Sequence, residues 1–234
     1  MMTRRPTLVL FDIDGTLILS GRAGVRGMNL AFSRLYGREK ALDGVAIAGR
    51  TDRAIVIDAM RGIGQDPTEA AIHRLRDAYF EHLRVELGRA VTDPSGVLPG
   101  VASLLDALES QAHVAVGLLT GNFEGGAAIK LGHFDLWHRF PFGAFGDEHV
   151  DRRALVAVAV HRAKAGLHHV GAPDRIIVIG DTPLDVDCAQ ASGAVAVAVA
   201  TGPFDRAALA ATDPDLLVDS LAELDAVLRV VADP

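Results

Sequence analysis

Two aspartates stand two positions apart where an apolar stretch of the chain ends. Asp12 and Asp14 follow the apolar run Leu8–Phe11 and precede a Gly-Thr turn. Because residues i and i+2 of a strand point the same way, the two carboxylates would crowd like charges unless a cation or a bound proton offsets them. Asp181 follows a second apolar run, residues 176–179, in the same manner. We expect the two acid clusters to share one metal ion.

Short apolar runs and longer amphipathic segments alternate along most of the chain. The expected strands are Leu8–Phe11, Val114–Leu119, Arg175–Ile179, Val195–Ala200 and an edge strand at Leu216–Val218. The expected helices are Val101–Ser110, Glu124–Leu131, Arg152–Ala165, Pro183–Ser192, Asp205–Ala211 and Leu221–Val231. This alternation predicts an α/β fold with a doubly wound, Rossmann-like parallel sheet. Ligands bind such sheets beyond the carboxyl ends of the strands, where both acid clusters and Thr120 fall.

Residues 18–94 depart from this alternation, since they consist almost wholly of helical segments separated by polar breaks. We expect them to form an inserted small α-helical cap domain, with residues 1–17 and 95–234 forming the α/β core. The junctions Leu17–Gly24 and Asp93–Gly100 are rich in glycine, proline and small residues, which suits hinges.

Length and charge limit the classes of partner. A chain of 234 residues can form one α/β domain with a sizeable insertion, and its net charge of −7 disfavours nucleic-acid binding. The single cysteine, Cys188, implies a reducing compartment. The first apolar run is interrupted at Asp12, too early for a membrane span. We therefore expect a cytoplasmic protein, monomeric or homodimeric, that acts on a small molecule and not on a membrane.

Three motifs, each after an expected strand, occur in a fixed order. They are Asp12–Thr16 (DIDGT), Leu118–Asn122 (LLTGN) and Gly180–Asp185 (GDTPLD). With these motifs the chain resembles the haloacid dehalogenase-like hydrolases, in particular the branch with a small helical cap that includes the phosphoglycolate phosphatases. The resemblance covers essentially the whole chain.

The resemblance implies roles for the two leading acids. Asp12 corresponds to the nucleophile of the family and Asp14 to its general acid/base. Mg²⁺ prefers hard oxygen ligands, which Asp12, Asp181 and the backbone carbonyl of Asp14 would supply. Asp185 matches the acidic motif and is expected close to the metal, whereas Asp187 is expected to cap or solvate its helix.

The same resemblance implies the groups that hold the phosphoryl oxygens of the substrate. Thr120 is the hydroxyl residue that ends the second strand of the family. Backbone N–H groups that follow Asp12 and Thr120 would complete the set and supply electrostatic stabilisation. The residues expected to bind substrate in this way are Gly15, Thr16, Gly121 and Asn122.

The third motif of the family departs from its usual form here. The family usually has a lysine at the start of the helix before the acidic strand, whereas this chain has Asp151-Arg152-Arg153. We expect Arg152 to bridge Asp12 and a phosphoryl oxygen, with a planar and permanent charge in place of an ammonium. Arg153 is the rival for this role, and Lys164 is a more remote one.

A glycine-flanked break in the expected cap contains Gly49-Arg50-Thr51-Asp52. It resembles the loop that related enzymes lower over the site, so Arg50 is a candidate ligand for the non-reacting end of an anionic substrate. The alternative is that Thr51 or Asp52 is simply the N-cap of a helix over residues 53–61.

These observations favour a Mg²⁺-dependent phosphomonoester hydrolase that acts on a phosphoglycolate-like metabolite or a sugar phosphate through an aspartyl-phosphate intermediate. A phosphosugar mutase would use the same intermediate, but it needs a second basic cluster in the cap. A phosphonate-cleaving enzyme would use a cap lysine, for which Lys40 is the only candidate. Dehalogenation is disfavoured because it needs neither Asp14 nor a metal. A phospho-aspartate receiver would need an open face, which a helical cap would cover.

Overall fold

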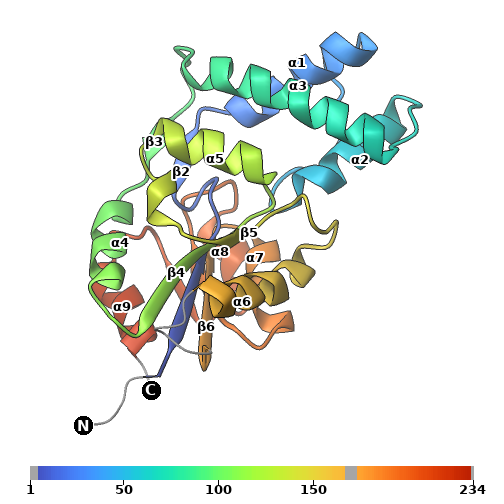
Figure 1. The fold of residues 1–234 in the computed structure, drawn as a ribbon. Coiled ribbons are helices and arrows are strands. Elements are labelled where there is room, and N and C mark those ends of the chain that lie inside the picture. Colours follow the sequence, from blue (N-terminus) through green and yellow to red (C-terminus); the bar gives the residue numbers. More distant parts are fainter. Residues whose placement is uncertain (1–4, 167–172, 233–234) are drawn as a thin grey trace.

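The computed structural model describes residues 5–166 and 173–232. Six parallel strands form one sheet in the order β5-β4-β1-β6-β7-β8 (Figure 1). Their bounds are β1 Thr7–Phe11, β4 Val114–Leu119, β5 Gly143–Ala144, β6 Arg175–Gly180, β7 Val195–Val199 and β8 Leu216–Val218. The predicted doubly wound parallel sheet is confirmed. The two-residue strand β5 was not predicted, because so short a segment has no periodicity of its own.

Helices cover both faces of this sheet, as the crossovers between parallel strands require. One face carries α4 (Val101–Glu109), α5 (Glu124–His133) and α9 (Leu224–Ala232), and the other carries α6 (Leu155–Gly166), α7 (Pro183–Ala191) and α8 (Arg206–Ala210). Two 3₁₀ turns, Trp137–Arg139 and Arg152–Ala154, precede β5 and α6 in the chain.

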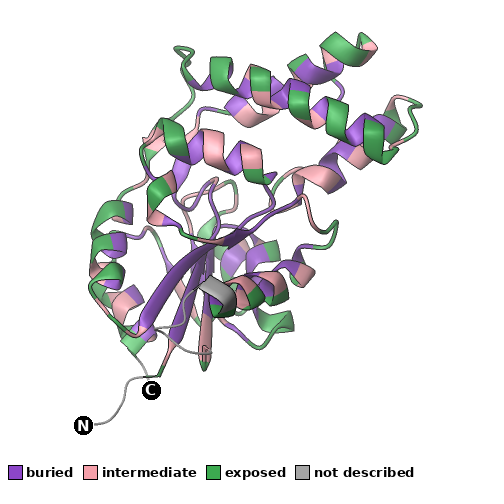
Figure 2. Cartoon of the chain, in the orientation of Figure 1, coloured by how far each residue is buried: buried purple, intermediate pink, exposed green. Residues whose placement is uncertain are grey.

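Strand β1 shows why the sheet is buried on both sides. Val9 and Phe11 join the apolar cluster under α4 and α9, while Leu8 and Leu10 join the cluster under α6 and α7. All four side chains are fully buried, which explains the continuous apolar run in the sequence. Figure 2 shows the same pattern, with buried strands and helices whose outer faces are exposed.

Three further helices pack into a helical unit with an apolar cluster of its own. This unit contains α1 (Ala23–Tyr36), α2 (Asp52–Gly62) and α3 (Glu69–Leu87). The chain enters it through β2 (Ile18–Ser20) and leaves it through β3 (Ser95–Val97), and these two strands pair antiparallel. The unit lies at the end of the molecule opposite to the two termini (Figure 1). The division into a cap of residues 18–94 and a core of residues 1–17 and 95–234 stays a prediction.

Local capping fixes where several helices begin. The Thr51 and Thr68 hydroxyls accept hydrogen bonds from the N–H groups of Ala54 and Ala71 at the starts of α2 and α3. Observed and predicted helix ends differ by at most a few residues; α9, for instance, begins at Leu224 instead of Leu221. Within the described residues, no helix has both the length and the hydropathy that crossing a bilayer requires.

Candidate active site

The strand order brings three motif residues to one edge of the sheet. β1 lies between β4 and β6, so Asp12, Thr120 and Asp181, each directly after its strand, become neighbours. The Asp12 N–H donates to the Ile179 carbonyl at 3.0 Å, and the Thr16 hydroxyl donates to Asp181 Oδ1 at 3.0 Å. Asp12, Thr120 and Asp181 are all buried. The three motifs are far apart in the sequence, and the fold brings them together in one site.

Three buried carboxylates form a potential metal site. Asp12, Asp181 and Asp185 each offer an oxygen, and these oxygens lie within 4.8 Å of one another. Asp181 Oδ2 is buried and receives no hydrogen bond from any residue in the described part of the chain. A Cβ at Gly15, where φ is +85°, would overlap this oxygen, so only glycine leaves room beside it. An unpartnered buried oxygen in an all-carboxylate set fits a hard divalent cation such as Mg²⁺.

Burial and the neighbouring carboxylates raise the pKa values of Asp12 and Asp181. Burial raises the pKa of Asp12 to about 6, assisted by Asp185 and Asp14 and opposed by Arg152. Burial and the charges of Asp12 and Asp185 raise the pKa of Asp181 well above its usual value. Without a cation the cluster is therefore under electrostatic stress, which a bound proton or a metal ion relieves.

Arg152 is the cation that lies beside the acids. Its Nη2 is 3.0 Å from Asp12 Oδ1, and the same nitrogen pairs with Asp185. Its guanidinium also donates to the carbonyls of Gly49 and Leu119, both at 3.1 Å. Arg153 instead forms an exposed pair with Asp187. The geometry thus agrees with the expected choice of Arg152 over Arg153, and its role in catalysis stays a prediction.

A second cation, Lys130 on α5, was not found by the sequence analysis. Its Nζ lies 2.5 Å from Asp14 Oδ2 and 2.6 Å from Asn122 Oδ1, and its side chain is only 6% exposed. Asn122 Nδ2 also donates to Asp14 Oδ2, at 2.9 Å. Burial acts to raise the pKa of Asp14, but Lys130 and these hydrogen bonds hold it below its usual value. The sequence held one sign of this burial: Lys130 follows the apolar residue Ala127 by three positions, so both lie on the same face of the helix.

The two leading aspartates therefore do not share a counter-charge. Asp12 is paired with Arg152 from one side of the site, and Asp14 is paired with Lys130 from the other. Ser20 in β2 donates a further hydrogen bond to Asp14 Oδ1 at 3.3 Å. Separate cations resolve the repulsion that the sequence spacing predicted.

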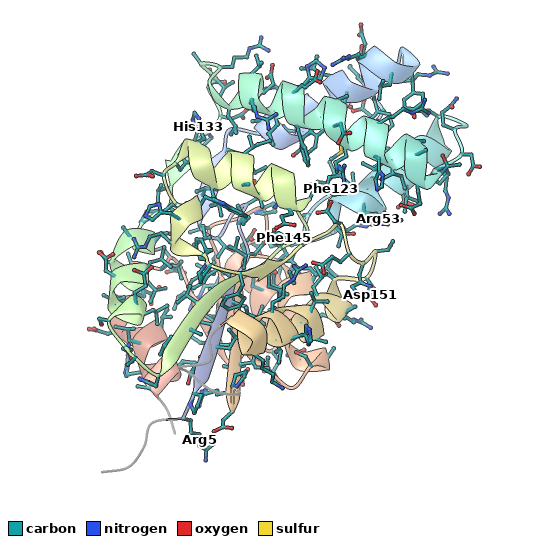
Figure 3. The ribbon with its side chains drawn as sticks, viewed as in Figure 1. Arg5, Arg53, Phe123, His133, Phe145 and Asp151 are labelled. Atoms are coloured by element: carbon teal, nitrogen blue, oxygen red, sulfur yellow. The ribbon has the colours of Figure 1, made fainter. Side chains whose placement is uncertain are left out.

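The second motif packs directly against the helical unit. The Gly121 carbonyl accepts a hydrogen bond from the Asp52 N–H at 2.6 Å, and a Cβ at Gly121 would overlap the backbone of Arg50. Asp52 Oδ2 in turn accepts from the Phe123 N–H at 2.9 Å. Phe123, at the start of α5 in Figure 3, belongs to the apolar cluster of the helical unit. This contact sets the helical unit against the carboxyl ends of the strands.

Arg50 lies near the site, but its guanidinium already has partners within the protein. It donates to Asp58 Oδ2 at 2.7 Å and to the Ala46 carbonyl at 3.0 Å. Thr51 is the N-cap of α2, which was the alternative interpretation of this break in the sequence. A role for Arg50 in binding substrate stays a prediction.

A cavity of about 670 Å³ lies between the helical unit and the carboxyl ends of the strands. Its floor contains the site residues Asp12, Asp14, Gly15, Gly121, Asn122, Lys130, Arg152 and Asp181. Its volume falls in the range of small-molecule sites, which span roughly 300–1,000 Å³. The arrangement places a buried carboxylate, a second carboxylate and cationic side chains on the lining of one cavity.

Comparisons with known proteins agree with this geometry. The family model described as haloacid dehalogenase-like hydrolase matches residues 9–190. The chain is 30% identical to phosphoglycolate phosphatase 1 of Pseudomonas aeruginosa over 95% of this chain and 79% of that protein. It is 27% identical to phosphoglycolate phosphatase of Synechococcus elongatus, over 92% and 94%. A crystal structure described as a predicted phosphoglycolate phosphatase from Haemophilus somnus shares the fold, with a TM-score of 0.68, 20% identity and coverage of 99% and 100%.

Proposed function

Since the chain belongs to the haloacid dehalogenase-like hydrolase family, we propose that it is a Mg²⁺-dependent phosphatase that hydrolyses small phosphomonoesters through an aspartyl-phosphate intermediate. In this proposal the helical unit is the cap, and the cavity beneath it holds the substrate. Phosphoglycolate, which the names of the relatives carry, and sugar phosphates are the first candidates to test. The proposed location is the cytoplasm.

The proposed mechanism follows from the positions of the side chains. Asp12 attacks phosphorus in line, and the bond from phosphorus to the leaving oxygen breaks. Asp14 gives a proton to the leaving oxygen and then takes one from the water that hydrolyses the aspartyl phosphate. The ion pair with Lys130 favours the ionised form of Asp14, which is the form that accepts the proton from water. The proton that Asp14 gives to the leaving oxygen in the first step is taken up from the bound phosphate monoanion of the substrate.

Other groups bind and orient the phosphoryl group. Arg152 lies next to Asp12 and supplies positive charge for a phosphoryl oxygen, together with Thr120 and the N–H groups of Gly121 and Asn122. A Mg²⁺ ion held by Asp12, Asp181 and the Asp14 carbonyl, with Asp185 close by, would offset the repulsion between the nucleophile and the phosphate. The observation that carries the proposal is the cluster of three buried carboxylates beside Arg152, of which Asp12 and Asp181 line the cavity together with that arginine.

Phosphate release is the direct test of this function. The purified protein is incubated with p-nitrophenyl phosphate, phosphoglycolate and a set of sugar phosphates, with Mg²⁺ or with a chelator. We expect release only with Mg²⁺. The Asp12→Asn variant should lose at least about 10³-fold in kcat, equivalent to about 4 kcal/mol of barrier, while its melting temperature stays at or above that of the parent.

Two outcomes would contradict the proposal. Release by Asp12→Asn within about tenfold of the parent, only about 1.4 kcal/mol of barrier, would exclude Asp12 as the nucleophile. If the protein is folded and binds Mg²⁺ but releases no phosphate, the result supports a different function, either a mutase or a receiver that stores phosphate.

A further inference from the structure

The wall of the cavity that the helical unit supplies contains a group of aliphatic side chains. Val25 and Met28 on α1 and Ile55 on α2 line it, and Leu42 and Ile47 from the segment between these helices complete it. Ile18 and Leu19 of β2 extend the same surface. These side chains favour contact with carbon and give no hydrogen bond to a hydroxyl or a carboxylate. The polar side chains of Arg22, Arg50, Asp52 and Tyr79 also line the cavity from this unit.

The cations that line the cavity are nearly all engaged within the protein. Arg152 pairs with Asp12, Lys130 pairs with Asp14, and Arg50 pairs with Asp58. Among the described residues that line the cavity, Arg22 is the one arginine or lysine whose side chain makes no ion pair or hydrogen bond, and it is exposed to solvent. A buried carboxylate on the substrate would therefore find no free buried cation on the helical unit.

The helical unit also places an acid, Asp52 of α2, on the lining of the cavity. Its carboxyl group accepts a hydrogen bond from the Phe123 N–H. When ionised, it repels an anionic group on the alcohol part of a substrate. Burying a carboxylate against aliphatic side chains without a partner costs several kcal/mol. The wall thus disfavours phosphoglycolate, because its alcohol part, glycolate, has only two carbons and one of them is a carboxylate.

We propose that the preferred substrate is a phosphomonoester of an uncharged, mainly apolar alcohol larger than glycolate, whose carbon chain packs against Val25, Ile47 and their aliphatic neighbours. This inference rests on the proposed phosphatase function and specifies the substrate class of the same site. The catalytic groups at the bottom of the cavity fix the phosphate, and the aliphatic wall selects the alcohol.

A chain-length series tests the preference. The kcat/KM for Mg²⁺-dependent phosphate release is measured with methyl, ethyl, n-propyl and n-butyl phosphate, with phosphoglycolate, and with p-nitrophenyl phosphate. Transfer of one methylene from water to an apolar wall predicts a rise of about fourfold per added carbon, until the wall is covered. Phosphoglycolate should fall below n-propyl phosphate.

Wall variants give a second measurement on the same enzyme. Val25→Ala and Ile47→Ala, both at partly buried positions, should each lower kcat/KM for n-butyl phosphate by about tenfold and leave methyl phosphate within about twofold. Leu30→Ala is the matched control, because Leu30 lies on the same helix as Val25, is 40% exposed and does not line the cavity. It should leave the whole series unchanged.

The possible failures are distinct. A flat chain-length series, or a higher kcat/KM for phosphoglycolate than for n-butyl phosphate, overturns this inference while the phosphatase function stands. If phosphoglycolate is preferred and Arg22→Ala removes that preference, recognition belongs to Arg22 and not to the aliphatic wall. No release from any ester, p-nitrophenyl phosphate included, overturns the proposed function and this inference with it.

Discussion

At the scale of single residues, the site separates its charges by giving each leading aspartate its own cation. Arg152 and Asp12 are 6% and 8% exposed in their side chains, so this pair is shielded from water, whereas Lys130 is 6% exposed and its partner Asp14 is 39% exposed. Removing Arg152 leaves both Asp12 and Asp185 buried without their cation, which costs about 3–5 kcal/mol, whereas Arg152 keeps Asp185 as a partner when Asp12 is neutralised. Arg152 is therefore important for stability as well as a candidate for the chemistry.

Substitutions at Arg152 and Arg153 separate the two neighbouring arginines. Arg152→Ala should lower kcat/KM for p-nitrophenyl phosphate by more than about 10²-fold and lower the melting temperature, because Asp12 and Asp185 lose their cation. Arg152→Lys keeps the charge and should recover part of the stability. Arg153→Ala removes only an exposed pair and should keep activity within about twofold. A larger loss in Arg153→Ala than in Arg152→Ala would move the role to Arg153.

The sequence predicted the residues that end strands and missed a residue that lies within a helix. Asp12, Thr120 and Asp181 could be placed together because parallel strands align their carboxyl ends. Lys130 could not, because its partner Asp14 is 116 positions away and the contact depends on how α5 lies over β1. The pairing of Arg50 with Asp58 could not be predicted either, since it depends on the path of the loop before α2.

At the scale of elements, one ion pair ties the first and last helices of the helical unit. Arg26 Nε on α1 lies 2.6 Å from Glu86 Oε2 on α3, and Arg26 also donates to the Gly21 carbonyl where the chain enters the unit. Glu86 is 6% exposed in its side chain. The pair therefore holds α1, α3 and the entry strand in one arrangement.

Glu86→Gln should lower the free energy of unfolding by about 2 kcal/mol at pH 7, because a buried charge-assisted hydrogen bond is lost. The hydrogen bond from Arg26 holds the pKa of Glu86 below its ordinary value of 4.5. Its stabilisation is thus present above pH 4.5 and is lost as the pH falls through the lower, folded-state pKa. The difference between parent and variant, measured by urea unfolding at pH 7 and at pH 4 and below, should shrink on acidification.

The control for this measurement is Glu81→Gln. Arg34 and Glu81 join the same two helices, but their side chains are 54% and 62% exposed. This variant should unfold like the parent at both pH values. An effect of Glu86→Gln that does not vary with pH would show that packing, and not charge, accounts for the loss.

The elements themselves were predicted more completely than their contacts. Five of the six strands of the sheet were found from their apolar runs, including the three-residue β8. β2, β3 and β5 were missed because Ile18–Ser20, Ser95–Val97 and Gly143–Ala144 contain no apolar run of three residues, and their pairing depends on partners in the folded chain.

At the scale of the whole molecule, the three buried acids link metal binding to stability. The carboxylates of Asp12, Asp181 and Asp185 come from two distant segments, and their mutual repulsion, which Arg152 offsets only in part, opposes folding in the absence of a metal ion. A ligand that binds only the folded state raises stability by about 2.7 kcal/mol at 100 times its Kd. The metal is thus expected to stabilise the fold as well as the reaction.

Thermal unfolding with and without Mg²⁺ measures this link. We expect saturating Mg²⁺ to raise the melting temperature by roughly 5–10 °C, and a chelator to reverse the rise. Asp181→Asn should show no rise, while its melting temperature without Mg²⁺ equals or exceeds that of the parent because one crowded carboxylate is gone. Asp187→Asn, which alters a surface acid paired with Arg153, should keep the full rise. An equal rise in Asp181→Asn would place the metal elsewhere.

The position of β1 in the sheet also determines when the sheet can fold during synthesis of the chain. This strand precedes both of its neighbours in the chain, since β4 begins at Val114 and β6 begins at Arg175. During synthesis on the ribosome its four apolar residues remain without a partner strand until β4 has emerged, and without the second partner until β6 has emerged, whereas helices α1–α3 emerge earlier than both. Folding of the sheet therefore depends on contacts of long sequence separation, which form slowly and leave an apolar strand open to association with other nascent chains.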